Sequence, residues 1–199
     1  KRKELLGLNS VVVFSPEEEA ITKGPPEGRR KFFNRVFSIC SKTYLEKLLT
    51  YNRVLKQRNA FLKQNQHNQK TSEHIEIWGE PLAEAGENLW GERIKLTKEF
   101  VANFKQTATE LDEKINATIK YKEKETNKKD VFRQIKKNNK QDIKRGFTTY
   151  GPHRDEIIFL WDKKGIRKNG SQGEHKLFLA LLKLTELLFI SKKTKKNPV

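Results

Sequence analysis

Apolar residues recur along most of the chain at the spacing of buried helix faces. They lie three or four positions apart over residues 29–41 and again from Leu82 to Leu111, and Leu48, Leu55 and Leu62 are seven apart with basic residues beside them. This spacing is typical of amphipathic helices with one buried side. We therefore expect an antiparallel helical arm.

Shorter runs predict a small sheet. Residues 11–14, 117–121 and 157–161 are apolar or alternating and have strand length. Residues 162–165 are expected to form a turn, and residues 166–167 are expected to begin the return strand of a hairpin. The predicted fold class is α+β, predominantly helical, with a small sheet or hairpin.

Two further helices are predicted in the second half of the chain. Lys128 to Arg145 is followed by Gly146, the usual residue at a helix C-terminus. A final helix is predicted from Glu174 to Ile190. Its buried face is predicted to carry Leu177, Leu181, Leu184 and Leu188.

The charge balance narrows the class of partner. The chain has 42 Lys and Arg against 25 Asp and Glu, a net charge of +17, and residues 120–145 alone hold eleven basic and four acidic residues. Such an excess favours polyanions, with nucleic acid first. The alternative is a helical scaffold without a nucleic-acid role, in which the charge serves only solubility.

The sequence disfavours a membrane-spanning protein and a protein held together by disulfides. No run approaches the ~18 apolar residues of a spanning helix, so a soluble, cytoplasmic protein that does not bind membranes is expected. Cys40 is the only cysteine, which excludes an internal disulfide and a cysteine-based metal site.

The segment Asn169–Glu174 is a glycine-flanked polar loop that opens directly into the last helix. Free backbone N–H groups and the positive end of the helix dipole meet at such a corner, so it could bind a phosphate. A plain helix cap is the alternative reading.

Four segments, taken in order, resemble the RecF family of ABC-type ATPases. The resemblance implies a helical arm joined to part of an ATPase head: residues 1–28 as a head strand and short helix, 29–113 as the arm, and 114–199 as the return into the head. The four segments are Phe14–Glu17 with Gly24–Pro25 and Arg29–Phe32, then Tyr51–Asn59, Thr149–Asp155 and Asn169–Glu174.

The resemblance implies that the last loop is an ABC signature. Its residues Gly170, Ser171, Gln172 and Gly173 would contact the γ-phosphate of an ATP held, with Mg²⁺, by a second copy in an ATP-dependent homodimer. The whole protein would bind double-stranded DNA and single-strand/double-strand junctions. It would act with RecR and RecO in loading RecA at gapped DNA during repair, replication and the SOS response, in the bacterial cytoplasm.

Two departures from the family pattern stand out. Glu174 replaces the usual Gln, and the sequence contains no G-x-x-x-x-G-K-[ST] loop and no strand ending in paired acids after the last helix. The family order places these elements before Lys1 and after Val199. The chain alone is expected neither to bind ATP tightly nor to hydrolyse it.

Basic residues near two of the segments are candidates for DNA phosphates. Their role would be backbone affinity, because Arg and Lys contacts to phosphates carry no base sequence. The alternative is that the arginines brace the structure against buried acids. The candidates are Arg29, Arg30, Lys31, Arg53, Lys56 and Arg58.

The turn containing His153, Arg154 and Asp155 allows several roles. Lining the nucleotide or DNA side of the head is what the resemblance implies. A structural turn fixed by Pro152, with Arg154 paired to Asp155, is a second reading. The competing enzyme hypothesis is a metal-dependent nuclease that uses His153 and Asp155, although this segment offers too few ligands for a metal centre and none is predicted.

Overall fold

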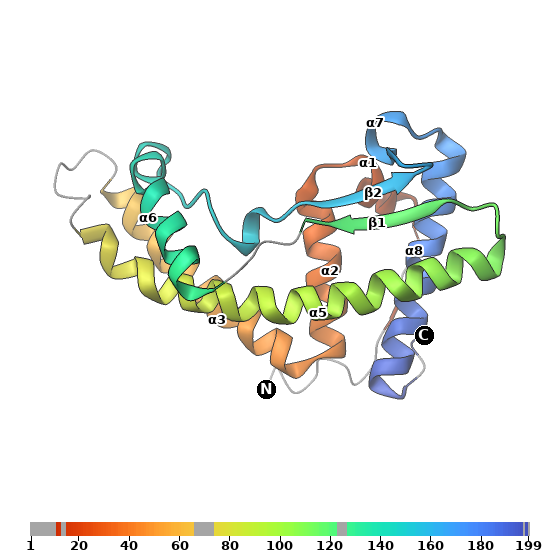
Figure 1. Ribbon diagram of the computed structural model, residues 1–199, viewed down its shortest axis with the longest axis horizontal. Coiled ribbons are helices and arrows are strands. Elements are labelled where there is room, and N and C mark those ends of the chain that lie inside the picture. The colour runs from red at the N-terminus through yellow and green to blue at the C-terminus, as the bar shows by residue number, and fades with distance from the viewer. Residues whose placement is uncertain (1–10, 13–14, 66–73, 123–126, 197, 199) are drawn as a thin grey trace. The chain divides into compact units, whose positions relative to one another are not determined.

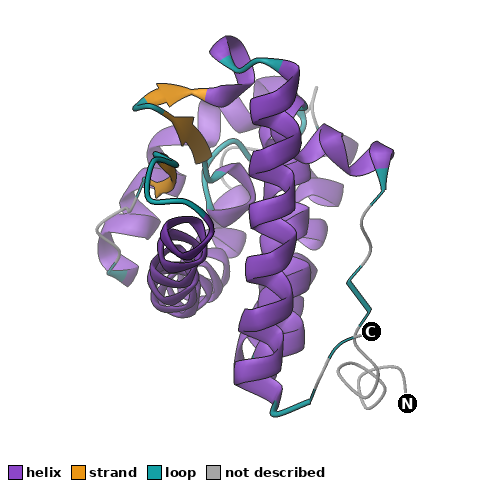
Figure 2. Ribbon diagram, turned by 90° about the vertical axis from the view of Figure 1, so that its right-hand side faces the viewer, coloured by secondary structure: helices purple, strands orange, loops and turns teal. Residues whose placement is uncertain are grey.

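The computed structural model describes residues 11–12, 15–65, 74–122, 127–196 and 198. Helices make up most of this part of the chain, as Figure 2 shows. The chain forms two compact units: residues 1–42, 95–122 and 156–199 form the first, and residues 43–94 and 123–155 form the second. No described helix is long and apolar enough to cross a membrane.

The first unit combines a small sheet with helices that pack on one of its faces. Strand β2 lies between β1 and β3 in an antiparallel sheet, and α2 and α8 pack against each other (Figure 1). Its elements are η1 (Pro16–Glu19), α1 (Ala20–Lys23), α2 (Pro26–Cys40), the later part of α5 (Gly79–Leu111), β1 (Ala117–Tyr121), β2 (Ile157–Trp161), β3 (Lys164–Gly165), α7 (Ile166–Asn169) and α8 (Gln172–Thr194).

Aromatic rings fill the core of the first unit. Phe100 of α5 lies edge-on to Phe33 of α2 and to Phe189 of α8, at centroid distances of 5.2 and 5.3 Å. Phe178 of α8 stacks on Phe159 of β2 at 4.8 Å. Each ring removes a large apolar surface from water, and edge-on pairs add to that gain. These contacts place α8, and the loop that precedes it, on the sheet.

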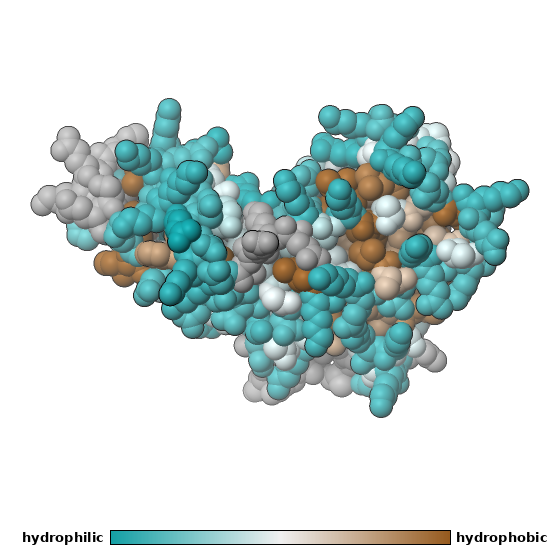
Figure 3. Space-filling model, in the orientation of Figure 1, coloured by the Kyte–Doolittle hydropathy of each residue, from teal (hydrophilic) through white to brown (hydrophobic). Residues whose placement is uncertain are grey.

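The outer face of the sheet is less covered. Ile119 and Phe159, paired across β1 and β2, are buried, whereas Ile158 and Leu160 point the other way and are half-buried. Figure 3 shows apolar side chains on the visible surface over these two strands.

The second unit is helical around a polar centre. Tyr44, Tyr51, Leu89 and Trp90 are buried in it, together with two arginine–aspartate pairs described below. Its elements are most of α3 (Lys42–Gln64), η2 (Ile75–Trp78), the first part of α5, α6 (Lys128–Arg145) and η3 (Pro152–Arg154). Gly146 ends α6 in the left-handed conformation, with φ of 72°, as the sequence predicts.

The units divide the chain differently from the predicted boundaries. Residues 29–41 were expected in the arm, but the phenylalanines of α2 pack on Phe100 and Phe189 in the first unit. Residues 123–155 were expected with the head, but α6 joins the second unit because Asp142 pairs with Arg58. Long-range contacts of this kind leave no periodicity in the sequence.

Three local predictions need correction. Val11 and Val12 are not in a strand, and the rest of that predicted strand lies outside the described residues. Ile166 begins the short helix α7, so the return strand is only β3. Leu184 and Leu188 are 44% and 45% exposed. The last helix has apolar residues on more than one side. Its buried side contains the larger rings of Phe178 and Phe189.

Candidate nucleotide and DNA sites

The signature corner, residues 170–174, forms the N-terminus of α8. Ser171 is the N-cap: its Oγ accepts a hydrogen bond from the Glu174 N–H at 3.3 Å, and the Glu174 carboxylate accepts one from the Ser171 N–H at 2.6 Å. This reciprocal pair is a capping box. The position where the family has Gln therefore has a structural role in this chain.

The corner is accessible. Ser171, Gln172 and Gly173 are all exposed, and a Cβ at Gly173 would meet no atom within 4 Å. The N–H groups of Gln172 and Gly173 lie in the first turn of α8, where helix geometry supplies no acceptor. With the helix dipole behind them, these groups suit an anionic oxygen.

Gly170 has a packing role. A Cβ there would lie 2.6 Å from Cγ1 of Ile166 and 2.7 Å from its carbonyl oxygen. Its N–H donates to that same carbonyl at 2.8 Å. A side chain at this position would force α7 away from α8, so glycine keeps the corner in place.

His175, the residue after the corner, connects α8 to α1 through a hydrogen bond. Its Nδ1 lies 2.9 Å from the Thr22 Oγ1, and that hydroxyl already donates to the Glu19 carbonyl. Nδ1 therefore carries the proton and donates. Burial, and then the charge of Lys23, lower the pKa of His175, which favours the neutral ring. Sequence reasoning assigned this residue no role.

Two of the predicted DNA contacts are interior residues. Arg29 is 5% exposed and donates to the carbonyls of Ile157 at 2.7 Å and Gly24 at 3.1 Å. Arg58 is fully buried and pairs with Asp142 at 2.7 Å. Both guanidinium groups are engaged inside the protein: Arg58 braces against a buried acid, as the alternative predicted, whereas Arg29 donates to backbone carbonyls.

The other four basic candidates are not buried. Lys31, Arg53 and Lys56 are exposed, and Arg30 is half-buried. Lys31 forms an ion pair with Glu27 at 2.7 Å, but three quarters of its side chain is exposed. Arg30 and Lys31 belong to the first unit, and Arg53 and Lys56 to the second.

The His153 turn is a hydrogen-bonded structural element. The Nε2 of His153 lies 3.0 Å from the Thr148 carbonyl and therefore donates to it, so Nδ1 accepts the Tyr51 hydroxyl proton at 2.5 Å. Both ring nitrogens are occupied. Gly151, with φ of 141°, lets the chain pass Tyr51, because a Cβ there would lie 2.3 Å from the Tyr51 hydroxyl.

The structural reading predicted that Arg154 pairs with Asp155. Asp155 pairs with Arg93 instead. It is buried and accepts from the Trp90 indole N–H at 2.9 Å and from Arg93 at 2.5 Å. Arg154 is exposed and lies over the ring of Phe147, 5.1 Å from its centroid.

The described residues contain no cluster of three or more His, Cys, Asp or Glu that could hold a metal ion. His153 and Asp155 also have their polar atoms engaged by Tyr51, Trp90 and Arg93. The geometry therefore does not favour the nuclease hypothesis.

One face of α6 carries a group of exposed basic side chains. Its exposed positions recur at three and four, so they form a single stripe. Lys136 pairs with Glu76 and Arg133 with Asp130. The inward face holds Val131, Ile135 and Asp142. The stripe consists of Lys129, Arg133, Gln134, Lys136, Lys137, Lys140, Gln141, Lys144 and Arg145.

The sequence already contained this signal as the basic run over residues 120–145. Which of those cations share one face could only be decided once the buried side of α6 was known.

RecF proteins match the chain along its whole length. The DNA replication and repair protein RecF of Lachnoclostridium phytofermentans is 33% identical over 202 residues, which cover 100% of this chain and 55% of that protein. RecF of Chloroherpeton thalassium is 30% identical over 207 residues, 98% of this chain and 56% of that protein. The chain is homologous to RecF.

Solved RecF structures agree. Two structures of the recombination mediator protein RecF in the RecFOR pathway, described as RecF-ATPrS and RecF-ATP, superpose with a TM-score of 0.89 each. They are 28% and 30% identical and cover 100% and 98% of this chain. No protein-family model matches. The chain spans about half the length of the RecF relatives it matches, 55% in the first case.

Proposed function

We propose that this chain is the DNA-binding and signature-bearing part of a RecF-like ATPase of the bacterial cytoplasm. The observation that carries the proposal is the exposed corner at the N-terminus of α8. The chain that contains it is similar to RecF along the whole length of this chain. RecF structures are described with ATP and ATPrS, which supports a nucleotide as the ligand.

The corner can act as one half of a composite nucleotide site. Ser171 Oγ and the N–H groups of Gln172 and Gly173 would donate to the γ-phosphate of an ATP held with Mg²⁺ by a second copy. The helix dipole of α8 adds to this attraction. Two copies would thus be joined only while the terminal phosphate is present, and its hydrolysis would release them.

Replacing Ser171 by Arg should abolish this link. In the full-length protein we expect ATP-driven dimerisation to weaken at least about 30-fold, because losing a buried charge-assisted contact costs roughly 2–5 kcal/mol. Sedimentation equilibrium with and without ATP measures it. Thr109→Arg, on an exposed position of α5, is the matched control and should dimerise normally. Normal dimerisation by the Ser171 variant would refute the role of the corner.

The α6 stripe supports duplex DNA as the macromolecular ligand. Between Lys129 and Arg145 it extends on the order of 24 Å at ~1.5 Å per residue, enough to follow several phosphates of one strand. Arg53, Lys56 and Arg154 add exposed cations in the same unit. These contacts are non-specific, so junction preference would come from RecR and RecO, with which the whole protein would load RecA at gapped DNA and serve the SOS response.

The stripe can be tested by charge removal. For Lys129→Gln, Lys137→Gln and Lys140→Gln together, we expect weaker duplex binding for all sequences and a fall of about 2 to 3 in the slope of log K against log salt. Fluorescence anisotropy over a salt series measures both.

The control for the stripe removes three exposed lysines of α5: Lys95, Lys98 and Lys105. It makes the same change in net charge. If it weakens binding as much as the α6 variant does, affinity follows overall charge and the stripe is not the DNA surface.

A further inference from the structure

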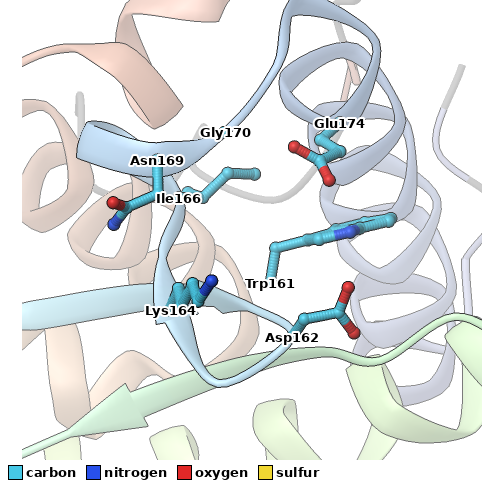
Figure 4. Close-up of a pocket in the computed structure, with 7 residues that line it drawn as sticks. All are labelled: Trp161, Asp162, Lys164, Ile166, Asn169, Gly170 and Glu174. Carbon is cyan, nitrogen blue, oxygen red and sulfur yellow. The ribbon is translucent and has the colours of Figure 1, made fainter.

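His175, the residue after the signature corner, packs against it. A Cβ at Gly170 would lie 3.2 Å from the His175 Nε2, so the imidazole ring lies close to the backbone of that glycine. His175 is 4% exposed. Gly170 lies where α7 passes into α8, and it lines a small pocket with Trp161 and Glu174 (Figure 4). The position of the imidazole ring therefore limits where the first turn of α8 can lie.

The other ring nitrogen of His175 joins α8 to α1. Nδ1 donates to the Thr22 Oγ1 at 2.9 Å, and Thr22 is fully buried. The Thr22 hydroxyl donates in turn to the Glu19 carbonyl at 3.0 Å, which directs its lone pairs toward the imidazole. A buried hydrogen bond depends on both distance and angle. This one therefore resists sliding and rotation of α8 against α1.

The segment that carries Thr22 is itself tied to the sheet. Arg29 of α2 donates to the Ile21 carbonyl at 3.4 Å and to the Gly24 carbonyl at 3.1 Å. These two acceptors lie on either side of Thr22 in the sequence. The same guanidinium donates to the Ile157 carbonyl of β2 at 2.7 Å. Thr22 is thus a fixed point in the first unit, to which His175 attaches the start of α8.

We propose that Thr22 and His175 are positioning residues for the signature corner. Through this pair the fold holds the N–H groups of Gln172 and Gly173 where a phosphate presented by a second copy can accept from both. The proposal rests on the proposed function, since the pair needs a corner that binds that phosphate. Both side chains are buried, so they act through the corner and do not touch the ligand. A small displacement of the donors would weaken the contact, because hydrogen bonds lose strength outside a narrow geometry.

Thr22→Val in the full-length protein removes the acceptor at nearly unchanged volume. We expect the ATP-dependent dimer association constant to fall on the order of tenfold, which corresponds to one net hydrogen bond at the upper end of its usual range. Sedimentation equilibrium measures it, at a temperature where every variant is folded. Thr22→Ser keeps the hydroxyl and should dimerise normally. Affinity for duplex DNA without ATP should not change in either variant.

Thr185→Val is the matched control. Thr185 is a fully buried threonine of α8, but its hydroxyl donates to the Leu181 carbonyl of the same helix at 2.7 Å. The substitution removes the same group from the same unit without touching the link to α1. We expect normal ATP-dependent dimerisation. A loss equal to that of Thr22→Val would show that any buried hydroxyl has this effect, and would refute the proposal.

A double-mutant cycle tests whether the two residues act as one unit. His175→Leu removes the ring, and His175→Asn keeps a donor near the position of Nδ1 and should recover part of the dimerisation. If the pair positions the corner, Thr22→Val combined with His175→Leu should lose no more dimer affinity than His175→Leu alone. Independent losses that multiply in the double variant would contradict a shared role.

A merely structural contact gives a different pattern. Thr22→Val would then lower the urea midpoint, while the folded protein would dimerise with ATP like the wild type. That result, together with a loss of dimerisation in Ser171→Arg, would leave the corner in place and refute the positioning pair. If Ser171→Arg itself dimerises normally, the proposed function fails, and the positioning role fails with it.

Discussion

Replacing Arg58 by Ala is expected to destabilise the second unit by about 3–5 kcal/mol, the usual cost of removing one partner of a buried ion pair. Arg58 is fully buried. It donates to Asp142 at 2.7 Å, to Thr148 at 2.6 Å and to Asn139 at 2.9 Å. Without the guanidinium, the Asp142 carboxylate would remain in the interior with no cation beside it. Urea unfolding followed by circular dichroism measures the loss.

Arg53→Ala provides the control, because it removes the same charge from the same helix at an exposed position. We expect a change within about 0.5 kcal/mol. A second comparison replaces the pair together, Arg58→Met with Asp142→Leu, which should recover much of the loss because no lone charge stays buried. If Arg58→Ala and Arg53→Ala cost the same, the buried pair does not hold α3 and α6 together.

Replacing Asp155 by Ala is expected to cost a similar 3–5 kcal/mol, since Arg93 would keep its buried charge. Arg93 also donates to the Pro152 carbonyl at 2.7 Å and to the Tyr44 hydroxyl at 3.2 Å. The Trp90 N–H would lose its acceptor as well. The turn before β2 should therefore loosen, which faster amide hydrogen exchange over residues 148–156 would report.

The Asp155→Ala substitution also distinguishes a structural role of Asp155 from a role as a metal ligand in catalysis. A structural Asp155 predicts reduced stability and no change in the cleavage of DNA with Mn²⁺ or Mg²⁺. A metal ligand predicts the opposite: cleavage by the wild type, lost in Asp155→Ala at unchanged stability. Arg154→Ala, on the exposed neighbour, should be neutral in unfolding and serves as the comparison.

The sequence by itself determined the elements and much of the candidate site. Helices at 82–111 and 128–145 and strands at 117–121 and 157–161 were predicted within a few residues, because periodicity and end residues are local signals. The polar loop around Ser171 was predicted to open the last helix, and Ser171 is the N-cap of α8. The family resemblance, read from four short segments, was confirmed by RecF relatives and structures.

Only the tertiary structure decided which charged side chains are buried in internal pairs and which lie on the surface. Arg53 and Arg58 are alike in sequence, yet one is exposed and the other pairs with Asp142, 84 positions away. Likewise, Trp161 and Glu174 meet at one pocket only because α8 packs on the sheet through Phe178 and Phe159. Such burial is a property of distant partners, and no local spacing encodes it.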